Sequence, residues 1–456
     1  MVGRSAYEQL EQSGTGVIGD AVRSPKSFLG QPTPVTVAGV ARTPRELVAT
    51  ILEHAVNETQ EADPSFPFTS AVMTIPVDMD GRGRRELREA AREAGLAVHQ
   101  FVHEPLAALY AYLRGDNRLT ALAARLGESP VLVVDWGGGT LDLTVCRLQN
   151  QTLVQLQNRG EHRVGGDRFD ELLRNFVRQE HAEAHNLAAL EPMQVGASAR
   201  LLTQCELAKQ TLSSREDALI FVSNYLAIDG DAAHIEVEIT KEDLEELAQP
   251  LIDIALDGIT NTLEAARLDD QQVGLVLLTG GMSRMPMIRH ALERRFGIDR
   301  VPRVEGGEDL IALGAAWIAH DRARLRLAKP FELMLADDHP AELLPAGVRL
   351  PVDEESYPER FPVHCVDPRD GRARFVFTRP VDVGQPQPTD QRQTYAVLSL
   401  PVDPNLGPLD ERINVDVMVD SNLVLTVVAH SQLSSELAAR EIHQLEFGLG
   451  LGSEND

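Results

Sequence analysis

The chain has 456 residues, 43% of them hydrophobic, and 69 acidic residues against 43 basic ones give a formal net charge of −26. This length predicts two to four domains, and such an acidic surface argues against nucleic acid or an anionic membrane as the main partner. Three scattered cysteines argue against a disulfide scaffold or a zinc site. Without a membrane-length apolar run or a signal-peptide core, we expect a cytoplasmic protein.

Strand and helix patterns alternate along the first part of the chain. Ser70–Met79 predicts a strand that enters a proline turn, Arg84–Leu96 predicts a charged helix, and LAALYAYL predicts another helix. Further on, a helix is expected around Phe169–Glu180 and a longer one within Ile239–Leu268. The longer helix starts with the capping-box spacing of Thr240 and an aspartate three residues later. These patterns indicate an α/β architecture.

Helical periodicity gives way to short alternating runs after about Arg322. In RINVDVMVDSNLVLTVVAH, alternate residues from Ile413 to Val419 are apolar, and a turn at Asp420–Asn422 follows. This pattern predicts a β-hairpin with one buried face in a small all-β sandwich. We therefore expect an α/β domain over residues 1–322, a linker over 323–332, a sandwich over 333–447 and a flexible tail over 448–456.

The stretch VLVVDWGGGTLDLTV places three glycines between two strand-forming runs. Such glycines expose backbone N–H groups that can hold a phosphate. Asp135 and Asp142 flank the turn, and a cation such as Mg²⁺ would be needed between these carboxylates and a phosphate. The pattern is equally compatible with a glycine-rich hairpin that carries two solvated aspartates.

A second glycine turn, LTGGMSRMP, follows a buried strand near residue 280. Its glycine pair would let a flat ligand lie against the backbone, and Arg284 could stack on that ligand or bond to it. Alone, this turn is better explained as a plain strand-to-helix connection. Together, the two turns on repeated strand–turn–helix units predict a nucleotide clamped between two lobes.

The chain resembles the DnaK-type 70-kDa heat-shock chaperones, whose nucleotide domain has the duplicated actin-like fold. The similar segments occur in family order: KSFLG at Lys26, the region AVMTIPVDMDGRGRRELREAAREAGLAVHQFVHEPLAALYAYL, VVDWGGGTLD, VGGDRFD, CELAKQTLSS, LLTGGMSRMPMI and EDLIALGAAW. They extend from near residue 2 to about residue 322. The β region resembles the family's peptide-binding sandwich more loosely, through LLPAGVRLPV and the predicted hairpin.

The resemblance implies roles for matched residues, with ATP, ADP and Mg²⁺ as cofactors. Lys26 would orient the attacking water and the γ-phosphate, Glu104 would lie near metal and water, and Asp135 and Asp142 would hold Mg²⁺ through waters, with Asp142 assisting hydrolysis. The implied phosphate cradle is Gly137, Gly138, Gly139 and Thr140, of which Thr140 is also counted with the catalytic residues. Implied adenosine contacts are Glu206, Lys209, Ser213, Gly280, Gly281, Ser283, Arg284 and Glu308.

Each role has an ordinary structural alternative. Lys26 and Lys209 could be surface lysines, and Glu104 could simply favour the start of the following helix. Glu206 and Lys209 have the spacing of an ion pair on one helix face. Gln210 stands where the family often has an arginine against adenine, and Glu308 stands where an aspartate is usual.

The largest departure from the family pattern is at the start. The family begins with a hairpin that carries its first phosphate motif, whereas only 25 residues precede Lys26, and the GTG at Gly14–Gly16 is expected to be a loop. We expect either a truncated sequence, which the retained set of Lys26, Glu104, Asp135 and Asp142 favours, or a homologue that has lost ATPase activity. RARLRLAKPFELML also lacks the family's aliphatic–acidic linker. We expect no helical lid, so bound peptide should leave quickly.

The resulting hypothesis is a weak chaperone ATPase that couples Mg-ATP binding and hydrolysis to binding of extended unfolded peptides, with co-chaperones as possible partners. A second hypothesis is a catalytically impaired homologue that serves as a protein-interaction module. A third, a sugar or acetate kinase on the actin-like fold, fits less well, because those enzymes lack a sandwich.

Overall fold

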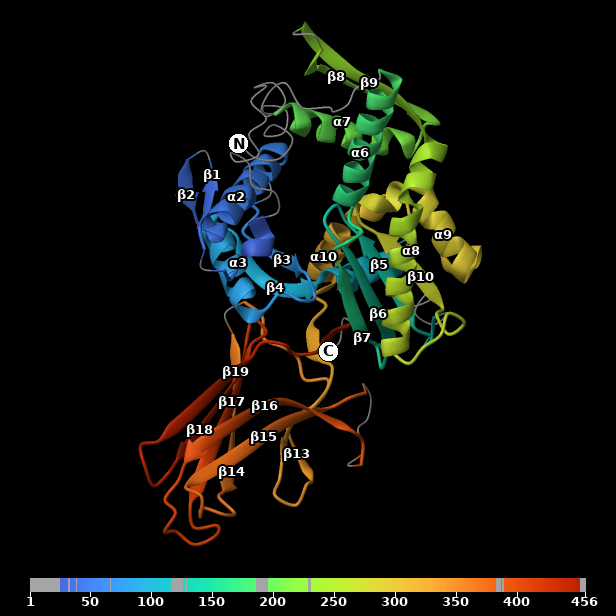
Figure 1. Cartoon of the computed structure of the whole chain (residues 1–456). Helices are drawn as coiled ribbons and strands as arrows, with labels where there is room; N and C mark the ends of the chain where they lie inside the picture. Colours follow the sequence, from blue (N-terminus) through green and yellow to red (C-terminus); the bar gives the residue numbers. More distant parts are fainter. Residues whose placement is uncertain are drawn as a thin grey trace. The chain divides into compact units, whose positions relative to one another are not determined.

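The computed structural model (Figure 1) describes residues 25–31, 33–37, 39–65, 67–115, 126–127, 129–185, 196–228, 231–353, 355–382, 387 and 389–451. The chain forms two compact units, each built from segments far apart in sequence. Unit 1 comprises Met1–Pro64, Thr120–Cys146 and Gln157–Ile311; unit 2 comprises Ser65–Leu119, Arg147–Leu156 and Ala312–Asp456. Across the described ranges, no helix combines the length and apolar character that a membrane crossing requires.

Two long helices of unit 1 begin at side-chain caps. Thr43 starts α2 (Pro44–Ala62) and Thr240 starts α8 (Lys241–Ala265), and both form capping boxes, the second as predicted. Other elements of unit 1 are η2 (Pro25–Phe28), β1 (Val35–Val37), β2 (Val40–Arg42), α6 (Gly166–Ala184), α7 (Ala197–Leu212), β8 (Asp217–Ile228), β9 (Asp231–Thr240), η4 (Gly281–Arg284), α9 (Pro286–Phe296), η5 (Ile298–Arg300) and η6 (Gly307–Asp309).

Three strands of unit 1 carry both predicted glycine turns. β5 (Val131–Trp136) pairs in parallel with β10 (Leu275–Thr279) and antiparallel with β6 (Leu141–Gln149). All five residues of β10 are buried, and so are all of β5 except Asp135. The strands predicted on either side of GGGT and before the glycine pair are therefore confirmed, and the carboxyl ends of β5 and β10 meet at one edge.

The first part of unit 2 has the predicted alternation of strand and helix. β3 (Ser70–Ile75) pairs in parallel with β4 (Ala97–His103), α3 (Gly81–Glu93) connects them, and α4 (Glu104–Arg114) follows. α10 (Leu310–Asp321) approaches α4 closely, since a Cβ at Gly314 would lie 1.9 Å from the Ala107 carbonyl oxygen. Glycine therefore sets the spacing of these two helices.

The β region contains two four-stranded antiparallel sheets, in agreement with the predicted sandwich. In β17 (Arg412–Asp420), which forms a hairpin with β18 (Leu425–Ser431), the side chains predicted to be buried, Ile413 to Val419 in alternation, are buried. One sheet has the order β13 (Pro340–Leu344), β12 (Phe331–Met334), β15 (Arg372–Pro380), β16 (Arg392–Pro401); the other has β14 (Ser356–His364), β17, β18, β19 (Leu437–Ile442).

Arg84 joins α3 to the sandwich within unit 2. Its guanidinium is buried and donates to the carbonyl oxygens of Met79 (2.5 Å), Asn422 (2.7 Å), Leu423 (3.2 Å) and His443 (2.7 Å). Burial lowers the pKa of Arg84 to about 10. The helix predicted as charged thus holds the turn of the β17–β18 hairpin.

Two segments differ from the predicted domain organisation. The linker expected over 323–332 contains a buried strand, β11 (Leu325–Leu327), and the units do not separate at residue 322. The flexible tail expected over 448–456 is wrong for its first residues, because β20 (Phe447–Gly450) is buried and pairs with β11 and with β7 (Thr152–Glu161). Residues 452–456 lie outside the described ranges.

Candidate functional site

Two glycine turns lie at the same edge of the unit 1 strands. Gly137–Thr140 follows β5, and Gly280 follows β10, whose last residue Thr279 is the parallel partner of Asp135. Gly280 has a φ of +83°, and a Cβ there would lie 2.5 Å from the Trp136 carbonyl oxygen and 2.6 Å from Asp135 Oδ1. Only glycine fits this approach, so the structure brings together the turns that the sequence paired.

The first turn contacts the start of α6 through its backbone. Gly166 N donates to Gly137 O over 3.1 Å, and Asp167 N donates to Gly138 O over 2.7 Å. Because a carbonyl and the following N–H point in opposite directions across a trans peptide, the N–H groups of Gly138 and Gly139 point away from α6. A Cβ at Gly139 would meet no described atom within 4 Å. Two successive amides of the turn therefore point to the side opposite α6.

Gly165 and Trp136 hold the segment before α6 against this turn. A Cβ at Gly165 would lie 2.3 Å from Gly139 C, so no larger residue fits. Trp136 Nε1 donates to Val164 O over 2.5 Å, and its ring packs edge-on against Phe169 with centroids 6.2 Å apart. Trp136 thus fixes the path of VGGD beside the glycine turn.

Lys209, an implied adenosine contact, lies beside the same segment. Its buried Nζ is 2.6 Å from Asp170 Oδ1 and donates to Gly166 O over 3.1 Å. Burial raises the pKa of Asp170 to about 6, although Lys209 opposes the shift. The alternative of a surface lysine is wrong, because the Lys209 residue is only 7% exposed.

The second turn carries an ion pair between its two short helices. Arg284 of η4 pairs with Glu308 of η6, which raises the pKa of Arg284 and lowers that of Glu308. Thr279 Oγ1 donates to Gly307 O over 2.7 Å and fixes η6 at the end of β10. A Cβ at Gly281 would meet no described atom within 4 Å. Arg284 and Glu308, both predicted as adenosine contacts, therefore lie next to each other at the second glycine turn.

Asp135 and Asp142 form a cross-strand pair of β5 and β6. Thr140 Oγ1 donates to Asp142 Oδ2 over 2.9 Å. Among the described residues, no cluster of three or more His, Cys, Asp or Glu side chains could hold a metal alone. Mg²⁺ usually keeps several waters and takes one or two carboxylates plus phosphate oxygens. Two carboxylates beside the glycine turn therefore fit the ligand set that a Mg-nucleotide needs.

The structure also places four further predicted residues, which are Glu206, Ser213, Lys26 and Glu104. Glu206 lies on the same face of α7 as Lys209, and Ser213 follows the last residue of this helix. Ser213 Oγ donates to Lys209 O over 3.2 Å. Lys26 is half-buried in η2 of unit 1. Glu104 is the first residue of α4 and belongs to unit 2. The roles implied for these residues stay predictions. The GTG at Gly14–Gly16, expected to be a loop, lies outside the described ranges.

Sequence reasoning assigned no site role to Gly165, Gly166, Asp170 or Met282. A Cβ at Gly166 would lie 2.9 Å from Met282 Sδ and 3.2 Å from Lys209 Nζ, so these groups are in close contact. The available signal was the glycine pair of VGGDRFD directly before a predicted helix, a pattern similar to that of LTGGMSRMP.

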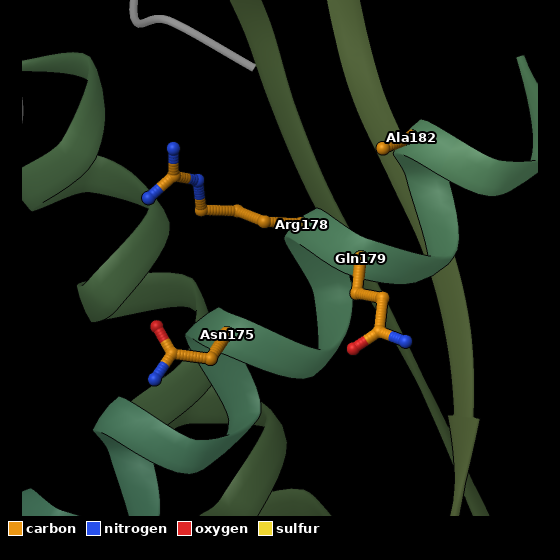
Figure 2. Close-up of a pocket in the computed structure, with 4 residues that line it drawn as sticks. All are labelled: Asn175, Arg178, Gln179 and Ala182. Atoms are coloured by element: carbon orange, nitrogen blue, oxygen red, sulfur yellow. The ribbon is translucent and has the colours of Figure 1, made fainter. Parts of the chain in front are cut away.

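A separate pocket of about 260 Å³ lies on one face of α6, lined by Asn175, Arg178, Gln179 and Ala182 (Figure 2). The spacing of these residues places all four on the same face of the helix. Small-molecule sites bring convergent polar groups into a largely apolar concavity, and this pocket has polar side chains from a single helix. The glycine turns are therefore the better candidate site.

Comparison with protein-family models gives one match over most of the chain. Residues 29–341 match the family described as Hsp70 protein. The match covers both glycine turns, α6, α7 and the first strands of the β region. The chain therefore belongs to the Hsp70 family, whose members bind ATP.

Proposed function

We propose that this chain is an ATP-binding chaperone of the Hsp70 type, in which Mg-ATP bound by unit 1 controls the binding of extended peptides by the sandwich of unit 2. The observation that supports this proposal is the glycine turn, where the Gly137 and Gly138 carbonyls accept from the start of α6 and the Gly138 and Gly139 amides point the other way. Membership of the Hsp70 family supports the same ligand.

Each group of residues has a task in this proposal. The amides of Gly138 and Gly139 hold phosphate oxygens, and Asp135 and Asp142 hold Mg²⁺ through waters. The bound metal supplies charge neutralisation at the phosphates, while the protein supplies positioning. Lys209, Ser213 and Glu206 on one side, and Arg284 with the glycine pair on the other, bind the nucleoside.

Two further residues would act on the hydrolytic water. Lys26 and Glu104 are proposed to orient water and γ-phosphate, with Thr140 and Asp142 completing the set. The peptide partner is supported by apolar side chains that the sandwich exposes, including Tyr357, Val397 and Leu437. An extended unfolded peptide would cover such side chains, and co-chaperones would regulate the cycle.

The first experiment is thermal unfolding with and without saturating Mg-ATP. A ligand at about 100 times its Kd stabilises the native state by about 2.7 kcal/mol. We expect a shift that requires Mg²⁺ and is lost in Asp135→Ala. Asp253→Ala, a change on the exposed face of α8, is the matched control and should keep the shift. A shift unaffected by Asp135→Ala would reject the assigned site.

A second experiment separates the ATPase chaperone from a protein-interaction module. Peptide affinity is measured with ATP, with ADP and without nucleotide, alongside ATP hydrolysis. The proposal expects hydrolysis and a peptide affinity that changes between ATP and ADP. Peptide binding that is insensitive to both nucleotides would favour the interaction module instead.

A further inference from the structure

The strand β20 is held on both sides by other strands of unit 2. Gly448, Leu449 and Gly450 pair antiparallel with Val154, Leu153 and Thr152 of β7. On its other side, Phe447, Gly448 and Leu449 pair antiparallel with Leu327, Arg326 and Leu325 of β11. β20 therefore fills a slot between β7 and β11, and its removal would expose two strand edges.

The pairing extends beyond the strand at both ends. Ala328 N donates to Glu446 O over 2.8 Å, Gly450 N donates to Arg324 O over 3.0 Å, and Leu451 N donates to Gln151 O over 2.7 Å. The backbone of residues 446–451 is thus bound in extended form, as in the strand-addition mode of peptide recognition.

The side chains of this segment match the slot in alternation. Phe447, Leu449 and Leu451 are buried, and the Phe447 ring lies 4.1 Å from the ring of His103. Between them the slot admits only hydrogen at Gly448, where a Cβ would lie 2.6 Å from the Leu153 carbonyl oxygen. A Cβ at Gly450 would lie 3.0 Å from Nε of the flexible Arg326 side chain and 3.3 Å from the Arg324 carbonyl oxygen, contacts that a shift of a few tenths of an ångström would relieve. The slot therefore selects apolar residues at 447, 449 and 451 with glycine at 448 and a small residue at 450.

We propose that the slot between β7 and β11 is a binding site for an extended strand of this pattern. Its resident ligand is the chain's own segment 446–451, and the same segment from a second copy of this chain can replace it. Exchange of an identical element between copies is a low-cost route to association. The inference does not depend on the proposed ATP or peptide function of the two units.

The test uses the full chain and a fluorescent synthetic peptide, LEFGLGLG, which corresponds to residues 445–452. In the wild type, the tethered segment competes at an effective concentration of about 1 mM. Gly448→Val should expel the segment, because its side chain would collide with the Leu153 carbonyl. We expect this variant to bind the peptide at least tenfold more tightly than the wild type. Gly450→Ala, the matched control, should resemble the wild type, and the peptide with Gly448→Val should not bind.

Absence of peptide binding by a folded Gly448→Val chain would overturn the proposal. If that variant does not fold, hydrogen exchange of the wild type decides. The amides of residues 446–451 should exchange together with those of Leu325–Leu327, faster than by global unfolding. Added peptide should slow exchange in β11 and β7. Exchange of the segment only through global unfolding would overturn the proposal, because a strand that is never released cannot be replaced.

Discussion

Replacing His103 should change how the stability of unit 2 depends on pH. His103 is 4% exposed, its Nδ1 lies 2.6 Å from Gln155 Oε1, and its Nε2 has no hydrogen-bond partner among the described residues. Burial lowers the pKa of His103 to about 3 from an ordinary value of 6.5. The folded state therefore contains the neutral form of the His103 ring, which packs against the Phe447 ring.

The sign follows from the proton count of the two states. Because the pKa is lower in the folded state, the unfolded state gains a proton first as pH falls through about 6.5. Stability is then lost by about 1.4 kcal/mol per pH unit until the folded-state pKa is reached. At about pH 5 the loss attributable to His103 is about 2 kcal/mol relative to about pH 7.

The assay is urea unfolding at about pH 7 and pH 5 in a Trp136→Phe background, so that Trp317, the other tryptophan of the chain, reports on unit 2. The free-energy difference between the two pH values should be smaller in His103→Asn by about 2 kcal/mol. His339→Asn, at a side chain that is 70% exposed, is the control and should keep the wild-type difference. Equal pH dependence in wild type and His103→Asn would refute the reasoning.

Three other substitutions test the site and the packing. Gly165→Ala should abolish the Mg-ATP thermal shift, because its Cβ would displace the Gly139 turn; a retained shift would mean that the turn does not hold the phosphates. The free energy of unfolding of Asp170→Asn should rise relative to that of the wild type as pH increases from about 4 to 6. The raised pKa of Asp170 means that the folded wild type disfavours the ionised carboxylate in that range, and the variant lacks this carboxylate. A difference between the two urea midpoints that stays constant over this pH range would contradict the reasoning. Gly314→Ala should destabilise unit 2 by about 1–3 kcal/mol through collision with Ala107, and an unchanged Trp317 unfolding midpoint would argue against the close helix contact.

The sequence predicted the elements that local patterns control. Alternation marked β17, and the capping box at Thr240 marked the start of α8. Three glycines marked the turn after β5, and a glycine pair marked the turn after β10. These features depend on residues within a few positions of one another, so the chain's local chemistry is sufficient to identify them.

The sequence could not identify groups whose partners are distant. Arg84 looks like a residue of a solvated helix, and its burial depends on carbonyls more than 330 positions away. Glycine weakens a strand, so Gly448 favours the interpretation of this segment as a tail. In the structure, glycine is required at this position because a Cβ would collide with the Leu153 carbonyl oxygen. The pairing of Lys209 with Asp170 likewise depends on how α6 and α7 pack.

The division of unit 2 among separate segments affects the order in which the protein can fold during synthesis. Unit 1 can be completed once residue 311 has emerged from the ribosome, but residues 65–119 need partners from 312 onward. At about 5–20 residues per second, α4 and its apolar side chains would wait for roughly ten seconds to a minute before α10 emerges. During that interval the apolar side chains of α4 lack their partners from α10, so we expect expression at low temperature or with added holdases to improve the yield.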